Sequence, residues 1–167
     1  MSIAFLIVRL ILGLGLAAHG CQKLFGWFGG GGIVGTGKFF EALGFRPGTT
    51  FALMAGLGET AGGLLTVLGL GGALGPVLIV TVMLVAIFTV HIEKGYFNSN
   101  GGWELPASNI AAALAVAFAG PGSYSLDAAL GLGFLYNPVH IWYALAAALV
   151  VAALNVLARR PARPVNS

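Results

Sequence analysis

Three long runs of this sequence contain no Asp, Glu, Lys or Arg, and they limit the possible folds more than any other feature. The runs are residues 60–92, 105–126 and 128–158. Each is at least as long as the roughly 20 apolar residues that a helix needs to cross the hydrocarbon of a bilayer. With only 8% charged residues in 167, the chain also has too little charge to cover a soluble domain. The sequence therefore predicts an all-α, polytopic membrane helix bundle.

Clusters of glycine and proline divide the chain into five expected membrane helices. These helices are predicted over residues 3–25, 51–70, 77–91, 107–119 and 139–158. A segment at 36–45 is too short to span, and its apolar side of Phe39, Phe40, Leu43 and Phe45 predicts a place at the membrane interface. Residues 1–131 thus contain the first four expected helices, and residues 132–167 add a fifth membrane helix and a basic tail.

The basic residues predict how the chain is oriented in the membrane. Five helices put the two termini on opposite sides. All of the basic residues except Arg9 then fall on the side of the C-terminus, namely Lys23, Lys38, Arg46, Lys94, Arg159, Arg160 and Arg163. Because cytoplasmic loops carry the excess of Lys and Arg, we expect the C-terminus in the cytoplasm and the N-terminus outside.

Glu59 is the only ionisable residue in the stretch 51–70 and is the centre of the expected site. A charged group far from both ends of a membrane helix costs on the order of 3 kcal/mol, so it usually faces a partner or a water-filled cavity. A rise of about 1.5 Å per residue brings side chains from four helices to one level of the bundle. The pocket candidates at this level are His19, Lys23, Glu59, His91 and Glu104.

Two interpretations of this polar level remain open. Imidazoles that titrate near neutrality, beside a carboxylate, favour a pocket that handles protons or binds a polar headgroup. Alternatively, the histidines are hydrogen-bonded core residues, Glu59 only locks neighbouring helices, and Lys23 and Glu104 extend their side chains to water. No EXXH or HXXXH spacing is present, so no metal is expected.

A charged pair is expected at the opposite end of the bundle. Arg9 in the first helix and Asp127 in the last external turn are predicted to form a structural ion pair there.

Cys21 is the single cysteine, which excludes an internal disulfide and a dithiol redox pair. The basic residues make no patch interleaved with aromatic residues, so no nucleic-acid partner is expected.

Six short blocks stand in order along the chain: His19-Gly20-x-x-Lys23-Leu24-Phe25-Gly26, Phe39-Phe40-Glu41-x-Leu43-Gly44, Ala55-Gly56-x-x-Glu59-x-x-Gly62-Gly63-Leu64-Leu65, Val90-His91, Gly101-Gly102-x-Glu104-Leu105 and Gly120-Pro121-Gly122-x-x-Ser125-Leu126-Asp127. In this order they closely resemble the DoxX family of small bacterial and archaeal inner-membrane proteins. The resemblance covers about residues 4–131, and the fifth helix with its basic tail departs from the usual pattern.

The resemblance implies a four-helix bundle in the bacterial inner membrane and a link to redox chemistry, because the family is related to quinol oxidase and thiosulfate:quinone oxidoreductase subunits. It supplies no settled catalytic residues. The leading hypothesis is a subunit or accessory factor of a quinone-linked redox system. The chain has no haem, flavin or iron–sulfur signature, so a quinone is the candidate cofactor and a redox protein or larger membrane complex the candidate partner. The alternatives are a small-molecule or proton transport module and a structural or assembly subunit without chemistry of its own.

Overall fold

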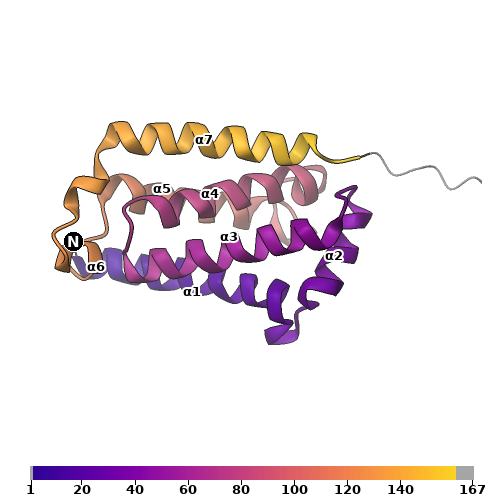
Figure 1. Cartoon of the computed structure of the whole chain (residues 1–167), viewed down its shortest axis with the longest axis horizontal. Coiled ribbons are helices and arrows are strands. Elements are labelled where there is room, and N and C mark those ends of the chain that lie inside the picture. Colours follow the sequence, from indigo (N-terminus) through magenta and orange to yellow (C-terminus); the bar gives the residue numbers. More distant parts are fainter. Residues whose placement is uncertain (1, 161–167) are drawn as a thin grey trace, which may run out of the picture.

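Five helices of the computed structural model lie side by side, and the segments that join them contain shorter helices and turns (Figure 1). They are α1 (Ser2–Phe25), α3 (Gly48–Leu68), α4 (Leu74–Ala86), α5 (Glu104–Ala119) and α7 (Pro138–Leu157). The structure describes residues 2–160, and within this range it contains helices and turns without strands. Helix α4 packs against α3, α5 and α7, so it is the central member, and α7 lies on the outside of the other four. The predicted all-α bundle is confirmed.

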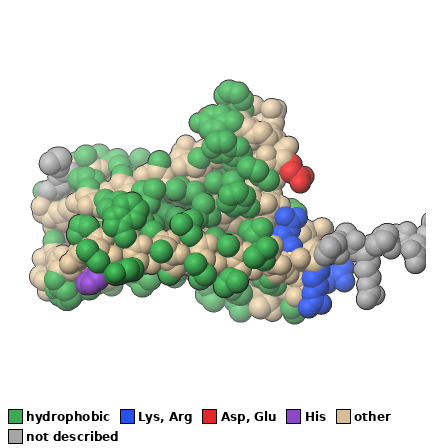
Figure 2. Space-filling view, turned by 90° about the horizontal axis from the view of Figure 1, so that it is seen from above, with side chains coloured by type: hydrophobic (Ala, Val, Ile, Leu, Met, Phe, Trp, Pro, Cys, Tyr) green, Lys and Arg blue, Asp and Glu red, His purple; other side chains and the backbone are tan. Residues whose placement is uncertain are grey.

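Four helical segments are long and apolar enough to cross a membrane: Ile3–Phe25, Gly48–Leu68, Leu74–Lys94 and Pro138–Leu157. The fourth expected helix, 107–119, corresponds to α5, which is shorter than these four segments. It has 16 residues and therefore rises about 24 Å, less than the roughly 30 Å of a bilayer core. Hydrophobic side chains cover most of the face in Figure 2, and Lys and Arg side chains gather at one end of it. The chain is therefore a multi-pass membrane protein.

The third span differs from its expected form at both ends. It begins at Leu74, before the predicted residue 77, because a proline in the first turn of a helix removes no hydrogen bond that the helix needs. After Ala86 the span continues as a π-helical turn, Ile87–His91, and then as a 3-10 turn, Ile92–Lys94. A π-helical turn is an uncommon feature that is frequent at functional sites.

Glycine residues allow α1 and α3 to pack with their backbones in close approach. A Cβ atom added to Gly63 would lie 2.4 Å from the carbonyl oxygen of Gly13, and one added to Gly20 would lie 2.7 Å from that of Gly56. The hydroxyl of Thr60 faces Gly20 at this contact and is buried without a hydrogen-bond partner among the described residues. Small residues that admit a neighbouring backbone are typical of membrane helix interfaces.

Helix α2 (Gly32–Ala42) folds across the end of the bundle at which α1 ends and α3 begins (Figure 1). It starts four residues before the predicted segment 36–45. The expected apolar side is divided, since Phe40 and Phe45 are buried against Ala52 of α3 whereas Phe39 is 49% exposed. The backbone N–H of Arg160 donates to the carbonyl of Gly44, which fastens the end of α7 to the turn after α2.

Candidate functional site

Glu59 of α3 forms an ion pair with Lys23 of α1. The carboxylate side chain is only 6% exposed, whereas the lysine side chain is 26% exposed. Gly20 contacts Thr60, so Glu59 lies beside Gly20, and Lys23 starts about one helical turn nearer to the end of α1. The lysine therefore connects a carboxylate inside the bundle with the surface of the protein.

One face of α1 is covered by neighbouring helices along only part of its length, and this explains why the ion pair is partly exposed. Leu12, Leu16, His19 and Lys23 follow one another on this face at helical spacing. Leu12 and Leu16 are buried in the core of the bundle, but His19 is exposed. Neighbouring helices thus cover the face as far as Leu16 and leave it open at His19, and the Lys23 side chain, one turn further along, is partly exposed.

The expectation that imidazoles from two helices meet Glu59 is corrected. His19 donates from Nδ1 to Oε1 of Gln22 at 3.0 Å, and the Gln22 amide donates in turn to the carbonyl of Phe28. His91 donates from Nδ1 to the carbonyl of Gly101 at 2.6 Å. Within the described residues neither ring forms an ion pair with Glu59, so each histidine orders a nearby loop instead.

Glu104 also has a local role in place of the expected one in a shared pocket. Its Oε2 accepts a hydrogen bond from the backbone N–H of Asn98 at 2.9 Å. This bond and the bond from His91 both fix the turns that join α4 to α5, which include the 3-10 turn Asn98–Asn100. Of the five predicted pocket residues, the structure therefore brings Lys23 and Glu59 into direct contact.

Arg9 is buried at the opposite end of the bundle, where it is 2% exposed. Its guanidinium donates to four backbone carbonyls, two in the last turn of α3 (Thr66 at 3.1 Å and Val67 at 2.9 Å) and two in the loop after α5 (Pro121, and Tyr124 at 2.8 Å). The direct ion pair with Asp127 is not formed and is corrected. Arg9 instead binds carbonyls in the last turn of α3, where helical partners run out, and the Thr66 carbonyl also accepts from the backbone N–H of Gly69.

Asp127 lies in the short helix α6 (Leu126–Ala129), whose N-cap Ser125 accepts a hydrogen bond from the backbone N–H of Ala128. The carboxylate accepts hydrogen bonds from the backbone N–H groups of Gly71 and Gly72, at 3.0 and 2.8 Å, and from the hydroxyl of Tyr136 at 2.9 Å. Arg9 and Asp127 therefore both hold the external loops in place, as expected, but each does so through its own set of partners.

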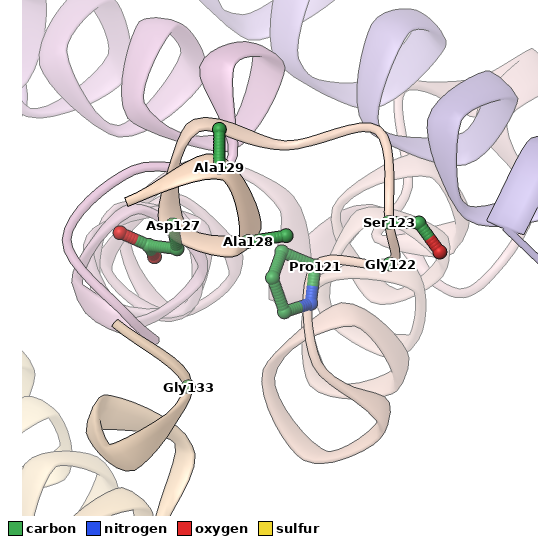
Figure 3. Close-up of a pocket in the computed structure, with 7 residues that line it drawn as sticks. All are labelled: Pro121, Gly122, Ser123, Asp127, Ala128, Ala129 and Gly133. Carbon is green, nitrogen blue, oxygen red and sulfur yellow. The ribbon is translucent and has the colours of Figure 1, made fainter. Parts of the chain in front are cut away.

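The external loops, residues 69–73 and 120–137, together form a loop layer at this end of the bundle. A pocket of about 510 Å³ lies over this loop layer, and Pro121, Gly122, Ser123 and Asp127 are among its lining residues. Figure 3 shows the Asp127 side chain pointing away from that of Ser123. Because the Asp127 carboxylate is fully buried and has three hydrogen-bond donors, it is already used by the fold. The arrangement indicates a structural role for this end of the protein.

Tyr136, in the 3-10 turn Gly133–Tyr136 that precedes α7, gives the loop layer a dependence on alkaline pH. Burial and the hydrogen bond to Asp127 raise the pKa of its hydroxyl. The unfolded chain releases this proton near pH 10 while the folded chain keeps it, so the stabilisation is complete below about pH 10 and is lost as the pH rises further.

We expect Tyr136→Phe to cost about 1 kcal/mol of stability near neutral pH through the lost hydrogen bond. The difference from the unmodified protein should shrink above about pH 10. Melting temperatures measured at a series of pH values test this, with the exposed Tyr143→Phe as the control. A difference that stays constant across the series would contradict the assignment.

Two features of the site have no counterpart in the sequence patterns. Gln22 is not among the predicted pocket residues, although it joins His19 to the turn after α1. The position of Lys23 four residues after His19 predicts that both share a face of the helix, but it does not predict where the neighbouring helices stop covering that face. No group of three or more metal-binding side chains comes together within residues 2–160.

Comparison with known proteins adds a family to this geometry. The model of the DoxX family matches residues 4–92, which include α1 to α4 and with them Lys23, Glu59 and His91. No curated protein and no solved structure matches the chain. Since the matched residues make up more than half of the sequence, the chain belongs to the DoxX family.

Proposed function

We propose that this protein is a quinone-binding subunit or accessory factor of a redox system in the bacterial inner membrane. The observation that carries the proposal is the ion pair between Lys23 and Glu59, in which a buried carboxylate is linked to the surface by a partly exposed ammonium group. An ionisable residue inside a membrane bundle is expensive to maintain and usually marks a functional site.

The donor set fits a quinone headgroup. A quinone presents two carbonyl oxygens as hydrogen-bond acceptors, and the Lys23 ammonium has three N–H donors, of which one is directed at Glu59. The exposed His19 lies on the same face of α1, where the cover by neighbouring helices ends. A headgroup that enters from the lipid could therefore reach Lys23 without any rearrangement of the bundle.

In this proposal the chain binds the headgroup and supplies protons, while the electrons come from elsewhere. A quinone held here would supply two-electron redox chemistry, and a partner electron-transfer protein would deliver the electrons because the sequence has no redox cofactor motif. Lys23 would donate a hydrogen bond to the headgroup, Glu59 would hold the ammonium in place, and the partly exposed lysine side chain would take up from water the protons that the pair supplies.

The basic residues support an orientation with the C-terminus in the cytoplasm and the N-terminus outside. Lys23, Lys38, Arg46, Lys94, Arg159 and Arg160 all lie at the end of the bundle where α1 ends, and Arg9 lies near the other end. Arg163, the remaining basic residue of the expected tail, is outside the described residues. With this orientation the ion pair would lie in the cytoplasmic part of the membrane.

Binding of a short-chain ubiquinone to the purified protein in nanodiscs tests the proposal. Trp27 lies two residues after the end of α1 and is exposed, so in a protein that also carries Trp103→Phe and Trp142→Phe, quenching of its fluorescence by the quinone reports binding near Lys23. We expect Lys23→Met to weaken binding about tenfold through the lost hydrogen bond to the headgroup. Glu59→Gln should weaken it by a similar factor because the ammonium is no longer held in position.

The control is Glu93→Gln, which removes an exposed carboxylate from the same end of the protein. It should leave quinone binding unchanged. If Lys23→Met and Glu59→Gln lower the melting temperature but bind quinone as well as the unmodified protein, the pair is only a structural lock. Proton flux through proteoliposomes that depends on Glu59, without quinone binding, would favour a transport module.

A further inference from the structure

The groove between α4 and α7 is lined by apolar side chains and lies away from the ion pair. Its volume is about 470 Å³, and its lining residues are Leu84, Phe88, Leu149, Ala152, Ala153, Val156 and Leu157. Along α7 these residues extend over eight positions, or about 12 Å of helical rise, which is most of the hydrocarbon thickness of one leaflet. The groove therefore has the length and polarity of a site for an acyl chain.

The packing of α7 explains why the groove opens in this half of the helix. Ile141, Leu145 and Ala148 of α7 are buried in the main core, so the first half of α7 lies close against its neighbours. The second half faces the π-helical turn Ile87–His91, where Phe88 is 52% exposed and does not fill the space. The groove is thus a consequence of backbone geometry and of the small side chains of Ala152 and Ala153.

The end of the groove is basic. Leu157 is the last lining residue, and the exposed Arg159 and Arg160 follow directly. Nε of Arg159 donates to the carbonyl of Leu43 at 2.9 Å, and its guanidinium lies 6.0 Å from the ring centre of Phe45. The backbone N–H of Arg160 donates to the carbonyl of Gly44 at 2.8 Å. These contacts fix the Arg159 side chain and the Arg160 backbone at the turn after α2, and both arginines come two or three residues after Leu157, the last lining residue of the groove.

We infer that this groove binds one anionic diacyl phospholipid, with an acyl chain between α4 and α7 and the phosphate at Arg159 and Arg160. Charge complementarity selects this occupant, because an apolar channel that ends at two fixed arginines matches a chain that ends at a negative headgroup. Figure 2 shows Lys and Arg side chains gathered at one end of an otherwise hydrophobic face. The site is independent of the proposed quinone site, so either can be lost without the other.

Native mass spectrometry of the full chain, purified in detergent and supplied with phosphatidylglycerol or phosphatidylcholine, tests the inference. We expect one molecule of phosphatidylglycerol to be retained in preference to phosphatidylcholine. Arg160→Gln should weaken its retention about fivefold, the effect of one basic residue near the headgroups. The control Lys38→Gln removes an exposed charge from α2, at the same end of the protein, and should have no effect.

A second pair of variants tests the groove without a change of charge. Ala153→Phe fills the groove and should abolish retention of the lipid, whereas Val150→Phe adds the same side chain to an exposed position of α7 outside the groove. Equal retention of both lipids by the unmodified protein, or equal retention by the two phenylalanine variants, would overturn the inference. A protein dimer that dissociates in Ala153→Phe would assign the groove to a second copy of the chain and also overturn it.

Discussion

Gly20→Ala is expected to destabilise the bundle by about 3 kcal/mol, although alanine is the better helix former. The added methyl group would lie 2.6 Å from the backbone nitrogen of Thr60 and 2.7 Å from the carbonyl oxygen of Gly56. Both are backbone atoms of α3, so no side-chain rotation relieves the clash. The two helices must separate, and they lose the close packing that holds α1 in the bundle.

Gly15→Ala is a matched control on the same helix. It makes the same chemical change in α1, but apart from the nearby backbone of α1 itself and the neighbouring residues in the chain, no atom lies within 4 Å of the new methyl group. Unfolding can be measured in mixed micelles that contain increasing amounts of a denaturing detergent. The free energy of unfolding should fall strongly in Gly20→Ala and should not fall in Gly15→Ala. Equal stability of the two variants would show that the approach of α1 to α3 is looser than the structure has it.

Much of the fold could be predicted from the sequence because a membrane restricts the choices. Long stretches without charge favour helices, because a helix satisfies its own backbone hydrogen bonds where lipid offers none. The predicted helix ends differ from the structure by about one turn. The predicted helix 77–91 leaves out Pro76, for example, but this proline lies in the first turn of α4. The predicted helix 107–119 likewise leaves out the first turn of α5, which begins at Glu104, and the turns before it are held by His91 and Glu104 through contacts that a helical pattern does not reveal.

The candidate site was predicted only in part, and the reason is geometric. Helical rise gave the depth of His19, Lys23 and Glu59 correctly enough to bring two of them together. Depth does not give the direction in which a side chain leaves its helix, nor how far a neighbouring helix covers it. His19 shares a face with the buried Leu16 but lies beyond the end of its cover. The flexible side chain of Lys23 reaches the carboxylate, whereas the short imidazole cannot.

Similar reasoning explains the incorrect ion pair at the other end. Arg9 and Asp127 were expected to bind each other because they are the only opposite charges near the external turns. The end of a helix, however, leaves carbonyl groups without partners and carries a partial negative charge. Arg9 satisfies this demand at the end of α3, and Asp127 satisfies the N–H groups of Gly71 and Gly72. The sequence pattern shows charged side chains but not which backbone groups lack a partner, and it therefore predicted a direct contact between Arg9 and Asp127.

Arg9→Met is expected to destabilise the protein by about 4 kcal/mol, since it leaves buried carbonyl groups without donors while keeping an apolar side chain of similar length. The four carbonyls that Arg9 binds belong to α3 and to the loop after α5. Loss of these hydrogen bonds should therefore release residues 121–127 first. Faster amide hydrogen exchange in this loop, measured by mass spectrometry, would locate the effect. Arg9→Lys keeps the charge but has three donors on one nitrogen, so it should recover only part of the stability.

Arg46→Met is the control for the loss of one positive charge, because Arg46 is exposed. It should change stability by less than about 0.5 kcal/mol. If Arg9→Met is as stable as Arg46→Met, the guanidinium does not hold the loops to α3 and Asp127 alone secures them. If Arg9→Lys is as stable as the unmodified protein, charge at the end of α3 is sufficient and the fork of hydrogen bonds is not needed. A graded loss from arginine through lysine to methionine is the result that the four-carbonyl contact requires.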